Sequence, residues 1–170
     1  MSTVKYYGKY RGVVVNNVDP EQRGRIMAIV PDIAGLIPGS WALPCVPFAG
    51  KQSGVYVVPQ VGAGVWIEFE QGDRDFPIWT GGFWGSAAEV PTLAVVGNPV
   101  SPSVILASGL LSSISISDVP GPTGGIMIKA ISGAMILVNE IGITISNGQG
   151  ASIVMTGPTV NVNNGALVVT

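Results

Sequence analysis

Short runs of alternating apolar and polar residues, separated by glycine-containing turns, fill the last third of the chain. The runs are four to six residues long, and the first is Ser113-Ile114-Ser115-Ile116-Ser117. From Gly133 onward the turns are marked by Gly142, Gly150, Gly157 and Gly165. Alternation indicates strands with one apolar face, and a repeat of about eight residues indicates short strands stacked as in a β-helix.

One face of these predicted strands is apolar, whereas Ser, Thr and Asn dominate the other face. A single ribbon has nothing to cover such a face, and unpaired strand edges promote aggregation. We therefore expect three copies wound about a threefold axis, with the strand edges paired between copies. The same face continues through Ile141, Met155, Leu167 and Val169. The expected trimer core consists of Ile114, Ile116, Ile126, Ile128, Ile136, Val138, Ile143, Ile145, Ile153, Val160 and Val162.

The first half of the chain has the pattern of a small β-barrel. Turn residues such as Asn17 to Pro20 and Gly72-Asp73 separate short alternating or β-branched segments. No segment of useful length has the 3.6-residue period of an amphipathic helix, so we expect an all-β fold with little helix. The predicted strands are residues 11–16, 25–30, 53–59, 65–70 and 77–81.

Charge divides the chain into two different parts. Charged residues make up 11% of the chain, against about 25% in an ordinary globular protein. All but four of them lie in residues 1–85, where positive and negative charges balance. We expect a barrel domain over residues 1–85, a linker rich in Pro, Gly and Ser over residues 86–112, and a β-helix spike over residues 113–170.

The composition excludes several classes of function. The chain has no His and one Cys, which excludes Ser/His/Asp triads, Cys/His dyads, His-ligated metal sites and intrachain disulfides. No catalytic residue, metal ion or cofactor is expected, and Cys45 is expected to be a small buried side chain. The apolar stretches are too short for a membrane-spanning helix, and no signal peptide is expected. The balanced charge of residues 1–85 argues against nucleic-acid binding.

A set of ordered motifs runs through the first half of the chain. It begins with Tyr10-Arg11-Gly12-Val13-Val14-Val15-Asn16-Asn17-Val18-Asp19-Pro20 and Arg23-Gly24-Arg25-Ile26, and continues through Trp41-Ala42-Leu43-Pro44-Cys45, Val65-Trp66-Ile67-Glu68-Phe69-Glu70 and Pro77-Ile78-Trp79-Thr80-Gly81-Gly82. The set resembles the OB-fold domain of the phage baseplate assembly protein V family, which is similar to the OB part of the VgrG spikes of type VI secretion. The resemblance implies an N-terminal OB-fold barrel followed by a C-terminal trimeric intertwined β-helix, a triangular prism.

The same resemblance implies a structural, non-enzymatic homotrimeric spike at the baseplate of a phage tail or contractile injection particle, assembled in the bacterial cytoplasm. The spike would puncture the target envelope, contact the target membrane transiently and carry a PAAR-repeat tip protein, with Leu167 and Val169 as tip-contact candidates. A hub protein beneath the tail tube would dock on charged barrel loops. The hub-docking candidates are Asp19, Arg23, Arg25, Asp73, Arg74 and Asp75. The alternative is a host-binding tail fibre or adhesin β-prism, which the barrel motifs disfavour.

Overall fold

The computed structural model of the chain describes residues 4–34, 39–95 and 103–170. The chain forms two compact units, Met1–Ala87 and Ala88–Thr170, which are described separately. Both consist mainly of short strands, which confirms the expected all-β class. The α-helices of the described residues, α1 (Pro31–Ala34) and α2 (Thr92–Val95), have four residues each. Single 3-10 turns lie at Glu70–Gly72, Ala87–Glu89 and Asn163–Gly165.

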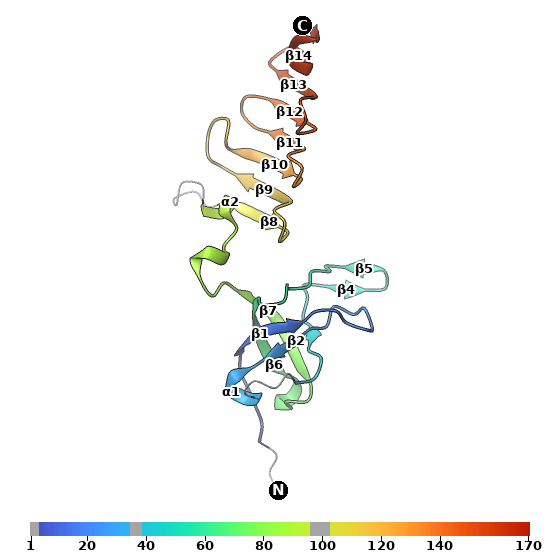
Figure 1. Ribbon diagram of the computed structural model, residues 1–170, viewed down its shortest axis with the longest axis vertical. Coiled ribbons are helices and arrows are strands. Elements are labelled where there is room, and N and C mark those ends of the chain that lie inside the picture. Colours follow the sequence, from blue (N-terminus) through green and yellow to red (C-terminus); the bar gives the residue numbers. More distant parts are fainter. Residues whose placement is uncertain (1–3, 35–38, 96–102) are drawn as a thin grey trace. The chain divides into compact units, whose positions relative to one another are not determined.

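The first unit is a curled five-stranded sheet with the strand order β2-β1-β6-β7-β3 (Figure 1). Just outside β2 and β3, Ile26 N donates to Ala42 O at 3.1 Å and Ala42 N donates to Ile26 O at 2.8 Å. This pair of hydrogen bonds joins the two ends of the strand order and closes the sheet into a small barrel, as expected for an OB fold. The strands are β1 (Tyr10–Asn16), β2 (Met27–Ile29), β3 (Leu43–Pro44), β6 (Gly64–Phe69) and β7 (Pro77–Phe83).

Inward-facing side chains fill the barrel. On β6 the buried residues Val65 and Ile67 alternate with outward-facing ones, which is the pattern expected of a strand with one buried face. Trp79 on β7 is buried and donates from its indole nitrogen to Gly24 O at 3.1 Å, so its polar atom has a partner. The barrel core consists of Val14, Ile26, Ala28, Val30, Ala42, Val65, Ile67 and Trp79.

The segment between β3 and β6 differs from the expectation. Of the predicted strand 53–59, only β5 (Ser53–Gly54) is a strand, and it pairs with β4 (Ala49–Gly50) in a hairpin separate from the barrel sheet. Pro59 has no N–H to donate to a ladder, and Val55, Val57 and Pro59 instead line an open groove together with residues 79–82 of β7. Cys45, expected to be buried, is exposed because it lies on this side of the barrel after the end of β3.

The second unit contains an eight-stranded antiparallel sheet within residues 103–170, with each strand hydrogen-bonded to its neighbours in the chain. Strand β8 lies inside the segment expected to be a linker, so the sheet begins before residue 113. Because the ladders form within one chain, the inner strands do not need the edge pairing between copies that we expected. The strands are β8 (Val104–Ala107), β9 (Ser113–Ser117), β10 (Gly125–Lys129), β11 (Met135–Val138), β12 (Ile143–Ser146), β13 (Ser152–Thr156), β14 (Thr159–Val162) and β15 (Leu167–Val169).

Candidate functional site

The register of the C-terminal sheet aligns its apolar side chains in two columns. Residues directly opposite each other in neighbouring strands point to the same face, so a chain of such pairs defines one column. Each strand contributes two residues, and every one of the sixteen is Ile, Val, Leu or Met. One column is Leu106, Ile114, Ile128, Ile136, Ile145, Ile153, Val162 and Leu167, and the other is Val104, Ile116, Ile126, Val138, Ile143, Met155, Val160 and Val169. We call these sixteen residues the apolar sheet face.

The apolar sheet face is largely open to solvent in a single chain. Ile128 is 49% exposed and Ile136 is 42% exposed, although both lie in the middle of the sheet. On the opposite face, by contrast, Ser113 and Ser115 of β9 are buried. Seven inter-strand spacings of about 4.8 Å make the apolar sheet face about 34 Å long. An exposed apolar surface of this extent indicates a protein interface.

The eleven residues expected to form a trimer core all lie on the apolar sheet face. Met155, Leu167 and Val169 lie there as well, as the alternation predicts. Ile141 does not, because it belongs to the turn between β11 and β12. Sequence reasoning missed Val104 and Leu106 of β8, for which the available signal was the short uninterrupted run of apolar residues over Val104–Ala107.

Glycines and asparagines hold the turns of this sheet in a tight stack. A Cβ atom on Gly142 would overlap the carbonyl oxygen of Met155, and one on Gly125 would overlap that of Val138. The Asn139 side-chain oxygen accepts hydrogen bonds from Ile141 N at 3.0 Å and Gly142 N at 3.2 Å. The recurring glycines share a positive φ at the turns, a backbone conformation that favours glycine, and close backbone approach adds a second reason at Gly142 and Gly125.

The turn between β1 and β2 is organised by Asp19. Its carboxylate accepts hydrogen bonds from the Arg25 guanidinium, at 2.6 Å for Nη2 and 3.0 Å for Nε, and from the backbone N–H groups of Glu21, Arg23 and Arg25. The hydrogen bond from the Arg25 side chain, followed by those from the backbone, holds the pKa of Asp19 well below its ordinary value. The same side-chain bond raises the pKa of Arg25. The Asp19 side chain is 3% exposed, so this pair braces the turn.

The other hub-docking candidates lie at the surface. Arg23 pairs with Glu21 at 3.0 Å, with both side chains exposed. Arg74 Nε lies 3.9 Å from Asp75 Oδ1 in the turn that precedes β7, and both of these side chains are exposed. Asp73 accepts a hydrogen bond from Asp75 N at 3.1 Å, which shapes the same turn. Of the six candidates, these four are the ones with side chains available to a partner.

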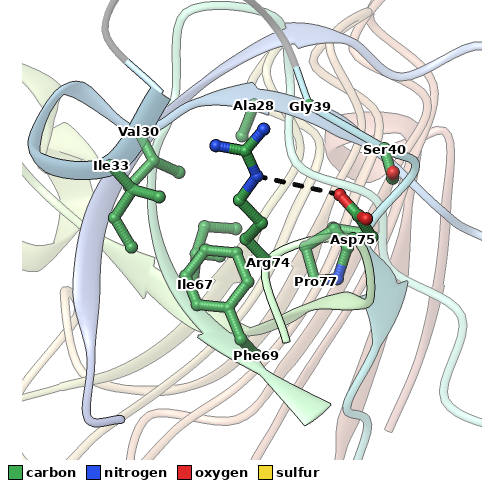
Figure 2. A pocket seen from close by; sticks show the side chains of 11 residues that line it. Ala28, Val30, Ile33, Gly39, Ser40, Ile67, Phe69, Arg74, Asp75 and Pro77 are labelled. Atoms are coloured by element: carbon green, nitrogen blue, oxygen red, sulfur yellow. Dashed lines mark ion pairs between the residues drawn. The ribbon is translucent and has the colours of Figure 1, made fainter. Parts of the chain in front are cut away.

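A pocket of about 440 Å³ opens beside the turn that contains Arg74 and Asp75 (Figure 2). Val30, Ile33, Ile67 and Phe69 form its apolar wall, and the Arg74 side chain lies across it. The charged groups among its described lining residues are Arg74 and Asp75, which pair with each other. No set of free polar groups converges on the pocket, so we assign it no ligand.

A second, more open groove of about 550 Å³ lies on the side of the barrel that carries Cys45. Its lining includes Cys45, Val55, Val57, Pro59 and Trp79, and none of the described residues that line it is charged. We call it the barrel groove. It has no polar or charged set suited to chemistry, and its apolar lining suits contact with another apolar surface.

No group of three or more His, Cys, Asp or Glu side chains in residues 4–34, 39–95 or 103–170 is placed to hold a metal ion. Within the same ranges, no helix has the length and apolar character needed to cross a bilayer.

The tip-contact candidates Leu167 and Val169 lie on β15, the last strand of the sheet, where both are exposed. Their side chains end the two columns of the apolar sheet face. The outer edge of β15 pairs with no other strand in the described part of the chain.

Comparison with protein families identifies both units. Residues 10–84 match the family model of the type VI secretion system/phage-baseplate injector OB domain, which corresponds to the barrel. Residues 103–168 match the phage baseplate V C-terminal trimerisation domain, which corresponds to the eight-stranded sheet from β8 onward. No curated protein matches the chain.

Proposed function

Because the chain belongs to the phage baseplate V family, whose members are structural baseplate proteins, we propose that three copies form the central spike of a phage tail or contractile injection particle. The observation that carries the proposal is the apolar sheet face. It is continuous, uncharged and open in the single chain, and it lies in the segment that matches a trimerisation domain.

In the proposed trimer each apolar sheet face turns inward toward the threefold axis. The sixteen residues of each copy then form an Ile- and Val-rich core shared by three sheets, while the opposite faces point outward. Backbone ladders within each chain already satisfy the strand edges between β8 and β15. The main driving force for association is therefore the hydrophobic burial of the apolar sheet face.

A trimer of this construction suits a puncturing role. Nearly continuous backbone pairing along the sheet and tight glycine turns resist bending, and residues 86–170 carry only four charged residues. Contraction of a sheath would push such a rod against the target envelope, and the rod would contact the membrane only in passing. The chain would make or break no covalent bond in this role.

The two ends of the spike would carry different partners. Leu167 and Val169 would form the last layer of this core, which is open at the end of the sheet, and a PAAR-type tip protein would cover that layer. At the barrel, the exposed charges of Arg23, Arg74 and Asp75, with the partly exposed Asp73 beside them, offer a polar surface for a hub protein beneath the tail tube. Asp19 and Arg25 would contribute to docking by shaping the turn that presents Arg23.

The position of the chain in an assembled particle tests this function. A gold label attached to the C-terminus should appear by electron microscopy as one site on the particle axis, at the distal end of the baseplate. A host-binding fibre or adhesin would place labels away from the axis, at several positions around the baseplate. That pattern would overturn the spike proposal in favour of the alternative.

A further inference from the structure

The C-terminal sheet and its turns carry very few charged side chains. Residues 103–170 contain Asp118, Lys129 and Glu140 and no other charged residue. All three are exposed, and among the described residues none of them forms an ion pair within the chain. Their charges are therefore available to a partner.

The antiparallel order of the strands separates these charges by sign. Asp118 begins the loop between β9 and β10, and Glu140 lies in the turn between β11 and β12, on the same side of the sheet (Figure 1). Lys129 ends β10 on the opposite side. The other end of β10 is Gly125, which pairs with Ser117. Because β10 spans about 13 Å between these ends, Lys129 does not reach the carboxylates of its own chain. We call the two lateral sides of the sheet the acidic side, with Asp118 and Glu140, and the Lys129 side.

We propose that Lys129 of each copy forms an ion pair with the acidic side of the neighbouring copy, at the corners of the proposed trimer. In a threefold ring of parallel sheets whose apolar faces turn inward, one lateral side of each sheet meets the opposite lateral side of the next sheet. The Lys129 side therefore meets the acidic side at every corner. The proposal rests on the homotrimer of the proposed function and names a contact between its copies.

The heights of the charges along the threefold axis agree with this pairing. Rotation about an axis leaves the height of each atom unchanged, so the heights within one chain are also those in the trimer. Asp118 follows β9, the strand before β10, and Glu140 follows β11, the strand after it. The Glu140 side chain also accepts a hydrogen bond from Gly121 N at 3.2 Å, which draws it toward the loop of Asp118. Since neighbouring strands are about 4.8 Å apart, Lys129 lies in height between the two carboxylates.

This ion pair gives the trimer an orientation that burial of the apolar sheet face does not. Both columns of that face consist of Ile, Val, Leu and Met, so a copy turned upside down would bury nearly the same apolar surface. Turning one copy over exchanges its lateral sides, which brings two acidic sides together at one corner and two Lys129 sides together at another. Like charges placed against each other reject the wrong arrangement. The charges therefore favour three parallel copies.

Coupling with a water-soluble carbodiimide tests the contact, because this reagent joins an amine to a carboxylate that touches it and adds no spacer. An exposed ion pair contributes little to stability, so contact is a better measure than melting temperature. After heat denaturation of the reacted wild-type trimer, electrophoresis should show covalently linked chains. Peptide mass spectrometry should find Lys129 joined to Asp118 or Glu140. Lys9 and Glu68, whose charged atoms lie 2.7 Å apart in one chain, are the internal positive control for the reaction.

Lys129→Arg removes the reactive amine and keeps the positive charge. K129R should therefore remain a trimer by light scattering but should lose the linked chains. Lys51→Arg is the matched control, because Lys51 is an exposed lysine of the barrel unit and lies outside the C-terminal sheet. K51R should give the same linked chains as the wild type.

The outcomes separate this proposal from the spike itself. A wild-type trimer that forms the link between Lys9 and Glu68 but joins Lys129 to no carboxylate overturns the ion pair and leaves the spike proposal standing. Linked chains that persist undiminished in K129R arise from other residues and also overturn it. A wild-type monomer overturns both proposals.

Discussion

Replacing Ile153 with glutamate should dissociate the trimer without unfolding the barrel. Ile153 lies in β13, opposite Ile145 on one side and Val162 on the other, and it is still 39% exposed in the single chain. Full burial of an isoleucine side chain contributes about 1.5–3 kcal/mol, so covering this remaining part contributes about 1 kcal/mol per copy. Glutamate loses that contribution and adds several kcal/mol per ion for a carboxylate in an apolar core.

Over three copies the loss amounts to about 10 kcal/mol. Since each 1.4 kcal/mol is a factor of ten, the trimerisation constant should fall by about seven orders of magnitude. Light scattering of the purified chain at micromolar concentration should then give the mass of one 17.5 kDa chain for I153E and three times that mass for the wild type. The barrel core is far in sequence from this change and should keep its circular dichroism.

Thr156→Glu is the matched control, because Thr156 is exposed in the same strand and points to the opposite face. T156E should remain a trimer. A carboxyl buried in a trimer has a raised pKa, so the trimer binds more protons than the free chains and I153E should reassociate as the pH falls toward about 4. An I153E protein that is still trimeric at neutral pH, or a T156E protein that dissociates equally, would refute the inward orientation of the apolar sheet face.

Three further results are expected. Arg25 holds the pKa of Asp19 below its ordinary value of about 3.9, so the pair should stabilise the barrel above that pH, and this stabilisation should be lost as the pH falls further. D19N should therefore lower the melting temperature at pH 7 and make the melting temperature fall less steeply in acid than it does in the wild type. Ile26→Ala, at a fully buried position, should lower the free energy of unfolding of the barrel by about 2–5 kcal/mol in urea titrations. Gly142→Ala should destabilise the sheet by about 1–3 kcal/mol through overlap with a neighbouring carbonyl, measured as a lower temperature at which the trimer dissociates in detergent.

Most strands could be predicted from local pattern. Residues 11–16, 65–70 and 77–81 were predicted as strands and correspond to β1, β6 and β7 within two residues, because alternation reports which side of a strand is buried. The prediction failed at residues 53–59, where apolar residues line an open groove and form no ladder. Composition alone does not distinguish a strand from an apolar surface segment.

Alternation also made part of the candidate site predictable. The identity of the apolar residues followed from alternation, but β8 was hidden in a segment whose Pro and Gly content suggested a linker. The charged barrel loops could be located, yet nothing in the local sequence separates the braced pair Asp19 and Arg25 from the freely exposed Arg74. That difference depends on how the turn folds back on itself.

The sequence by itself determined that the chain is all-β, that its C-terminal strands have one apolar face, and that this face needs partners. Alternation, glycine spacing and scarce charge are local properties, and each acts on a strand regardless of its neighbours. The tertiary structure alone decided that sixteen side chains align in two unbroken columns, because register depends on the length and geometry of every turn. It also decided that Cys45, Val57 and Trp79, distant in the chain, meet around one groove, since only the closed barrel brings their segments together.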